Sequence, residues 1–239
     1  MADDASKMRE PRKDRPIKLI VFDVDGTPVD SQHLIVAAQR EAFAAHGLEP
    51  PSRARSLSVV GLSLDEAFTA LVGLKGPVES LAAVYRKAFQ RLRTDPSAHE
   101  PLFPGAAETI AALAACESVV LGIATGKSRR GVAYLLARHR WDHIFATVQT
   151  ADDAPSKPDP AMLRQAMTEV GATPEATVMI GDTSFDMAMA RGAGAVPIGV
   201  SWGYHPVEAL REAGADRIVE SFAELRTLLN DTVASGCLA

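Results

Sequence analysis

The sequence predicts an α/β protein with a doubly wound parallel sheet, into which a block of helices is inserted. Two observations predict the sheet. Apolar, β-branched runs recur without period-two alternation, and amphipathic stretches separate them. Strands of this composition joined by helices are typical of parallel sheets covered on both faces. A third observation predicts the insertion, because no convincing strand is present between residue 31 and about residue 100.

Six segments have the composition of buried strands. They are residues 18–24, 118–125, 143–152, 176–183, 195–201 and 216–221. Between them, apolar residues recur at helical spacing in residues 105–115, 127–140, 159–171 and 184–194. In the third of these helices, Pro160 suits the first helical position and Gly171 suits the C-terminal cap.

The inserted block reads as helices over residues 31–47, 63–74 and 77–93. Residues 48–56 and 94–105 carry the prolines and glycines expected of connectors. We therefore expect four parts: a flexible leader (1–16), an α/β core (17–30 and 101–228), a helical cap domain (31–100) and a C-terminal tail (229–239).

Composition narrows the function. The chain has 239 residues, 47% hydrophobic and 23% charged, which is ordinary for a globular protein with a substantial core. Its formal net charge is -5 without a long basic block, so nucleic acid is not an expected partner. The N-terminal residues lack an apolar signal region, and no apolar run approaches membrane-spanning length. We expect a cytoplasmic protein, monomeric or homodimeric, without a membrane partner.

Polar side chains follow four of the predicted strands at the point where each strand ends. In chain order they are Asp23 and Asp25, Thr125, Lys157, and Asp182 with Asp186. Ligands of doubly wound sheets bind at the carboxyl ends of the strands, so these side chains should meet at one rim.

The chemistry of these side chains is complementary. Carboxylates crowded together require a cation, and Mg²⁺ prefers such oxygen ligands. Thr125, Lys157 and the amides of the 125–128 turn suit a phosphate. An ionised carboxylate facing a metal-bound phosphoryl group is a competent nucleophile, and a second carboxyl group can move protons. These two roles explain why Asp23 and Asp25 occur together at the end of a buried strand: one carboxylate attacks and the other moves protons.

The motifs "DVDGT", "ATGK", "SKPDP" and "GDTSFD" resemble, in order and spacing, the four signature motifs of the haloacid dehalogenase (HAD) superfamily. The resemblance covers about residues 17–228 and implies a Rossmann-like core. The inserted helices look like the C1-type cap of that superfamily. The patterns "DGT-x-VDS" and "VGLSLDEAF" are most similar to the phosphoglycolate phosphatase group.

The resemblance implies a role for each acidic residue. Asp23 would be the nucleophile and a Mg²⁺ ligand. Asp25 would be the general acid and base, with its backbone carbonyl on the metal. Asp182 would bind Mg²⁺ directly and Asp186 through water. Dehalogenases resemble this chain in fold but lack an acid at the position of Asp25, so a carbon–halogen bond is not the expected substrate.

The resemblance also implies a phosphate site. Thr125 and Gly126 would bind the transferring phosphoryl group, which would also face the amides of Val24 and Asp25. Lys157 would neutralise charge between that group and the nucleophile.

C1 caps select the leaving group, so Gly61 and Ser63 are expected in a substrate-specificity loop. Arg53, Arg55 or Arg86 would suit a second anionic group on the substrate.

The predicted activity is Mg²⁺-dependent hydrolysis of a small, phosphoglycolate-like phosphomonoester through an aspartyl-phosphate. Two alternatives use the same site residues: a β-phosphoglucomutase-like phosphotransferase and a pyrophosphatase. A catalytically silent phosphate-binding protein fits least well, because it would have no physical reason to keep so many costly charges.

Overall fold

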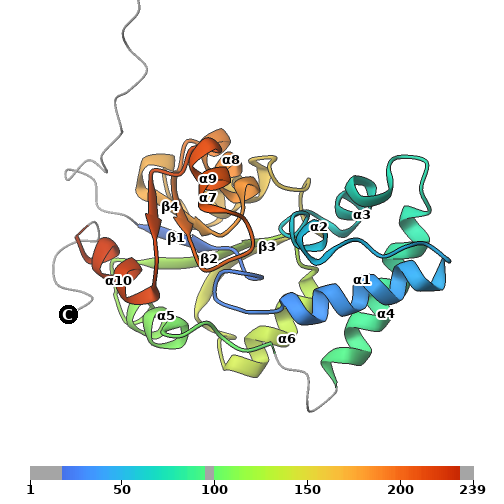
Figure 1. Cartoon of the computed structure of the whole chain (residues 1–239). Coiled ribbons are helices and arrows are strands. Elements are labelled where there is room, and N and C mark those ends of the chain that lie inside the picture. Colours follow the sequence, from blue (N-terminus) through green and yellow to red (C-terminus); the bar gives the residue numbers. More distant parts are fainter. Residues whose placement is uncertain (1–17, 95–99, 232–239) are drawn as a thin grey trace, which may run out of the picture.

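The computed structural model describes residues 18–94 and 100–231 (Figure 1). The predicted leader lies outside these residues, as does the predicted tail after residue 231. Among the described residues, no helix is long and apolar enough to span a membrane.

A six-stranded parallel sheet forms the centre of the core, in the order β3-β2-β1-β4-β5-β6. Its strands are β1 (Leu19–Phe22), β2 (Val120–Thr125), β3 (Phe145–Thr150), β4 (Thr177–Gly181), β5 (Val196–Val200) and β6 (Arg217–Val219). Each predicted strand is present, shortened by one or two residues at most ends. The doubly wound α/β prediction is confirmed.

Helices cover both faces of this sheet (Figure 1). They are α5 (Ala106–Ala114), α6 (Arg129–His139), α7 (Ala161–Val170), α8 (Ser184–Ala193), α9 (Val207–Glu212) and α10 (Phe222–Asn230). Ile20 and Phe22 of β1 pack in one hydrophobic cluster with residues of α5 and α10, whereas Leu19 and Val21 pack in another with α7 and α8. Because both faces of β1 are buried, its sequence shows no alternation.

Four helices follow β1 and precede the return of the chain to β2. They are α1 (Gln32–Ala45), α2 (Arg53–Leu57), α3 (Leu64–Val72) and α4 (Val78–Arg93), and we call them the cap. Their packing uses two clusters, one around Leu34, Leu57 and Phe89 and the other around Phe43 and Phe68. The cap therefore has hydrophobic cores of its own and lies beside the α/β core (Figure 1).

Three helices differ from the sequence-based expectation. Helix α2 lies largely within residues 48–56, which were expected to connect helices. Two prolines just before it favoured a connector. The helix begins after Ser52, whose side chain accepts from the Arg55 amide at 3.2 Å. Helices α9 and α10 were not expected. The first is only six residues long, and the second reaches Asn230, into the expected tail, because Leu229 is fully buried.

Candidate active site

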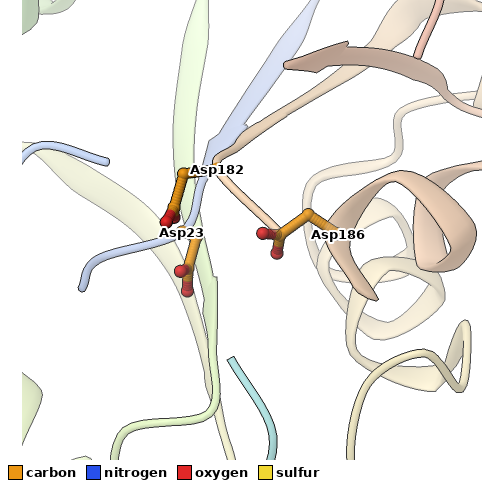
Figure 2. Close-up of side chains that lie close together, drawn as sticks. All are labelled: Asp23, Asp182 and Asp186. Atoms are coloured by element: carbon orange, nitrogen blue, oxygen red, sulfur yellow. The ribbon is translucent and has the colours of Figure 1, made fainter. Parts of the chain in front are cut away.

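Three carboxylates meet at the carboxyl ends of the central strands. Asp23 follows β1, Asp182 follows β4, and Asp186 lies in the first turn of α8. One oxygen of each lies within 4.8 Å of the others, and Figure 2 shows the side chains gathered around one point. All three residues are buried, with at most 1% exposure. The convergence expected from the strand ends is present in the structure.

Lys157 joins this cluster from the loop after β3. Its Nζ lies 2.8 Å from Asp23 Oδ1 and 2.6 Å from Asp186 Oδ1. One buried ammonium therefore faces three buried carboxylates. Asp23 Oδ2 is buried and has no hydrogen-bond partner among the described residues. The cluster has more carboxylate groups than positive charges, and one carboxylate oxygen has no partner among the described residues. Such oxygen atoms are suitable ligands for a hard divalent cation such as Mg²⁺.

The pKa shifts in this cluster show that ionising its buried carboxylates is unfavourable without a further cation. Burial raises the pKa of Asp23 to about 6, although Lys157 opposes the shift. Burial also raises the pKa of Asp182, with further contributions from the charges of Asp23 and Asp186. Burial alone would lower the pKa of Lys157, but the charges of Asp186 and Asp23 outweigh it and raise that pKa. Lys157 therefore stays protonated, and the carboxylates lack sufficient positive charge.

Asp182 is held by backbone that approaches it closely. Its carboxylate accepts from Thr27 Oγ1 at 3.0 Å and from the Tyr204 amide at 2.8 Å. Gly26 and Gly203 lie against it, and a Cβ at either position would overlap the carboxylate group or its Cβ. Gly26 also has a φ of 93°, which other residues rarely adopt. Only glycine fits at these two contacts.

Asp186 is held by the start of α8. Its Oδ2 accepts from the Thr183 amide at 3.0 Å and from Thr183 Oγ1 at 2.6 Å, and Thr183 Oγ1 accepts from the Asp186 amide. This reciprocal capping box leaves Oδ1 for Lys157. The residue has both a structural use and a place in the cluster.

Asp25, two residues after Asp23, has polar partners of its own. Lys127 Nζ lies 2.8 and 3.0 Å from the two oxygens of Asp25, and Ser31 Oγ donates to Oδ1 at 2.6 Å. Burial would raise the pKa of Asp25, but Lys127 and Ser31 outweigh it and lower that pKa. Asp25 is therefore ionised in this arrangement.

Lys127 is absent from the predicted site residues, although it closes the "ATGK" motif. Its Nζ lies 3.5 Å from Glu100 and 4.9 Å from the centre of the Phe89 ring. These contacts join the core to the cap helix α4 and to the returning chain. Its position directly after Gly126 was the signal that could have identified it.

Thr125 is the last residue of β2, and Gly126 follows it in the turn that leads into α6. Thr125 is buried, and its Oγ1 accepts from the Lys127 amide at 3.3 Å. Ser128 begins α6 by accepting from the Gly131 amide at 3.3 Å. Val24 is buried, and its carbonyl accepts from the amides of Thr27 and Val29. These contacts fix the backbone of the expected phosphate-binding turns.

A cavity of about 400 Å³ lies between the core and the cap. Asp23, Asp25, Thr125 and Gly126 line its core side, and Gly61 and Ser63 belong to its cap side. Of the three arginines expected near a substrate, only Arg86 lines the cavity. Arg53 donates to Gln32, and Arg55 donates to the Ala70 carbonyl, so these two are engaged elsewhere on the cap.

The cap loop that carries Gly61 and Ser63 packs directly on the core. The Ser63 amide donates to Ser156 Oγ at 2.8 Å, one residue before Lys157. A Cβ on Gly126 would overlap the carbonyl oxygens of Gly61 and Leu62. This loop therefore closes over the phosphate-binding side of the cavity.

Gly126→Ala is expected to lower kcat/KM by about 10- to 100-fold, because the new methyl group must displace the cap loop. Urea denaturation should show a change in the free energy of unfolding below about 1 kcal/mol, since the contact lies at the surface between cap and core. Gly192→Ala in α8 is the control, because its Cβ would make only an ordinary contact with Pro160. Unchanged kinetics in Gly126→Ala would contradict the closing role of the loop.

The loop after β5, residues 201–205, was not predicted as part of the site. Trp202 Nε1 donates to the Thr27 carbonyl at 2.9 Å, and the Ser31 amide donates to the Tyr204 hydroxyl at 3.0 Å. With the Tyr204 amide on Asp182, this loop connects the carboxylate cluster to the start of the cap. No local sequence pattern carries this information, because every partner is distant in the chain.

Comparison with known proteins places this site in a family. The sequence model described as "Haloacid dehalogenase-like hydrolase" matches residues 20–200, which include all four motifs. The chain belongs to this family.

Curated relatives and a solved structure are similar to this chain over most of its length. "Probable phosphatase IndB" of Dickeya dadantii (strain 3937) is 34% identical over 87% of this chain and 91% of that protein. A phosphoglycolate phosphatase of Rhodospirillum rubrum is 32% identical over 87% of this chain and 89% of its own. The crystal structure of a hydrolase from Pseudomonas syringae has a TM-score of 0.80 at 28% identity, and it covers 91% of this chain and 100% of its own. This HAD protein is a phosphatase.

Pro28 occupies a position where the resemblance leads one to expect an aliphatic residue, most often Leu. Its carbonyl accepts from the Phe103 amide at 2.9 Å. The turn around it uses the amides of Thr27 and Val29, both donating to the Val24 carbonyl. The turn therefore forms with proline in place, through its own carbonyl and the amides of its two neighbours.

Pro28→Leu is therefore expected to change turnover by only about a few-fold and to leave Mg²⁺ dependence intact. Steady-state phosphate release from both proteins, with and without Mg²⁺, measures this. An inactive natural protein that becomes active with leucine would show that Pro28 disables the site.

Proposed function

We propose that this phosphatase is Mg²⁺-dependent and transfers the phosphoryl group of a phosphomonoester to Asp23 before water releases it. The observation that supports this best is the state of the Asp23 carboxylate. One oxygen is held by Lys157, the other has no partner, and the residue lines the cavity. A fixed carboxylate with one oxygen unpartnered is suited to attack on a bound phosphoryl group.

Asp23, Asp182 and Asp186 would hold Mg²⁺, together with the Asp25 carbonyl that the resemblance implies. The ion would neutralise the phosphoryl oxygens and the carboxylates around them. Lys157 remains protonated between Asp23 and Asp186 and adds a second positive charge. Thr125 and Gly126 would position the phosphoryl group against Asp23.

In the first step, the carboxylate of Asp23 bonds to phosphorus while the bond from phosphorus to the leaving oxygen breaks. Asp25 is ionised in the free site, so the proton that it would give to that oxygen is the one that it takes from water in the second step of the preceding turnover. In the second step, water attacks the phosphorus of the aspartyl-phosphate, Asp25 takes the proton from water, and the Asp23 carboxylate is restored. Lys127 and Ser31 stabilise the ionised form of Asp25, which is the form that accepts this proton.

The proposed division of labour follows the two parts of the chain. Residues 17–30 and 101–228 would form the catalytic core, and residues 31–100 would form the cap that selects the leaving group. The names of the relatives support phosphoester substrates, among them phosphoglycolate. Pyrophosphate and a sugar phosphate transferred within the site remain the alternatives, since they would use the same residues of the core.

The test is phosphate release from phosphoglycolate, pyrophosphate and other phosphoesters, with Mg²⁺ and with EDTA. We expect release in Mg²⁺ and none after chelation. β-Glucose 1-phosphate separates the phosphotransferase, because conversion to glucose 6-phosphate without release of phosphate would support that alternative. Absence of both reactions across the panel would overturn the proposed function.

A further inference from the structure

The cap side of the cavity is mainly apolar and aromatic. Its lining includes Ile35, Val59, Val60, Leu62, Tyr85 and Phe89. Tyr85 and Phe89 lie one turn apart on α4, with ring centroids 5.7 Å apart and ring planes tilted by 32°. The Arg93 guanidinium and the Lys127 ammonium already lie over the Phe89 ring, 4.8 and 4.9 Å from its centre. A planar group would therefore pack mainly on Tyr85 and on the part of Phe89 that these cations leave free. This wall suits an organic ring better than a small acid.

The charged side chains of the cap wall are already paired. Arg86 lies 3.5 Å from Asp65, and Arg93 lies 2.7 Å from Glu100 in a buried ion pair. Arg130 also lines the cavity, but it belongs to α6 and is exposed to solvent, which screens its charge. Within residues 18–94 and 100–231, the cap therefore offers this cavity no unpaired cation for a second anionic group.

The cavity is also large for a phosphorylated two-carbon acid. Its volume of about 400 Å³ falls within the range of ~300–1,000 Å³ found for pockets that enclose drug-sized ligands. A phosphoglycolate molecule would fill only its catalytic end and would leave the apolar wall in contact with water.

One buried polar group of this wall lacks a partner. Gln39 of α1 is 4% exposed and lines the cavity. Its Nε2 lies 3.5 Å from the Ser56 carbonyl, while its Oε1 has no hydrogen-bond partner among the described residues. A buried acceptor without a donor is costly and uncommon, so a small rotation of this side chain toward the cavity would let the N–H donor of a ligand satisfy it.

We propose that the cap pocket selects phosphomonoesters of uncharged groups that carry a planar heteroaromatic ring with an N–H donor, with nucleoside 5′-monophosphates as the class that fits. The ring packs on Tyr85 and Phe89, its donor binds Gln39 Oε1, and the phosphate reaches Asp23. Gln39 is thus a specificity-determining residue. This inference rests on the proposed function for the phosphoryl half of the substrate.

Binding is measured separately from turnover, so that the two proposals can fail separately. The Asp23→Asn variant with Mg²⁺ is titrated calorimetrically with thymidine 5′-monophosphate, ribose 5-phosphate and phosphoglycolate. We expect thymidine 5′-monophosphate to bind at least about tenfold more tightly than the other two, because only it brings a planar heteroaromatic ring and an N–H donor. Preference for phosphoglycolate or ribose 5-phosphate would overturn the inference.

Gln39→Met, made in the same Asp23→Asn background, tests the named residue. It keeps the length of the side chain and removes the acceptor, so the preference for thymidine 5′-monophosphate should fall by about tenfold. The melting temperature should change little, because loss of the long 3.5 Å contact from Nε2 to the Ser56 carbonyl is offset by removal of an unpartnered buried oxygen. Gln165→Met on the exposed face of α7 is the matched control. An equal loss of affinity for all ligands, or no loss, would overturn the role of Gln39.

The wild-type enzyme separates this inference from the proposed function. Phosphate release from thymidine 5′-monophosphate at the highest kcat/KM of the panel supports both. Tight binding of that nucleotide without release of phosphate from any compound would overturn the proposed function and leave the inference standing. Faster hydrolysis of phosphoglycolate or pyrophosphate would overturn the inference alone.

Discussion

Asp23→Asn is expected to lower phosphate release by a factor on the order of 10⁴ or more, because the variant lacks the charged oxygen that attacks phosphorus. Asparagine has nearly the same shape, so the cavity and the cap should keep their structure. Acid-quenched reactions with labelled substrate should leave phosphate bound to the wild-type protein and none bound to the variant.

Asp142→Asn is the matched control for this experiment. Asp142 is exposed and lies outside the cavity lining, so its variant should keep wild-type activity. If Asp23→Asn retained more than about one hundredth of the activity, the nucleophile would have to be another group, and the proposed mechanism would be wrong.

Lys157→Met is expected to lower the free energy of unfolding by about 3–5 kcal/mol in the absence of Mg²⁺. Lys157 is 1% exposed and lies within hydrogen-bond distance of Asp23 and Asp186. Methionine fills a similar volume but leaves these carboxylates without a buried positive charge. Urea denaturation in EDTA measures the loss, with Lys75→Met as an exposed control.

The loss should depend on pH in a defined direction. The pKa of Asp23 is about 6 in the folded protein, against 3.8 for an unperturbed aspartate, and removal of Lys157 would raise it further. A carboxyl group with a raised folded pKa favours the folded state when it is protonated, and this contribution disappears as the pH rises through the folded pKa. Lys157→Met should therefore destabilise the protein least at a pH below the folded pKa of Asp23 and most at a pH above it.

Added Mg²⁺ should restore part of the stability of Lys157→Met above that pH, because the ion would supply the missing positive charge. Equal stability of variant and wild type in EDTA would show that the carboxylates are not ionised together in the folded protein. That outcome would remove the main argument for a cation in the cluster.

Much of this architecture is predictable because it follows from local patterns. Strands that are apolar on both faces indicate a parallel sheet, and the carboxyl ends of its strands bring together Asp23, Lys157 and Asp182. Only relative order along the chain is needed for this inference. The convergence of the motifs, although they are far apart in sequence, could therefore be predicted.

The parts that could not be predicted depend on contacts between distant segments. The ion pair of Lys127 with Asp25 spans 102 residues, and the hydrogen bond between Ser31 and Tyr204 spans 173 residues. No periodicity marks such partners. The contacts of Arg53 and Arg55 likewise depend on the packing of α2, a helix that the sequence did not predict. Gln39 has the sequence context of an ordinary helix residue, and only the cavity beside it distinguishes it.

The contact of the Ser63 loop with Ser156 and Gly126 has a consequence for the rates of substrate entry and product release. The loop contacts the core beside the phosphoryl end of the cavity, so we expect this loop to move when substrate enters and when phosphate leaves. One opening per catalytic cycle then sets an upper limit on turnover, however fast the chemistry is. A higher solvent viscosity should lower kcat even at saturating substrate, because the moving loop must displace the solvent around it.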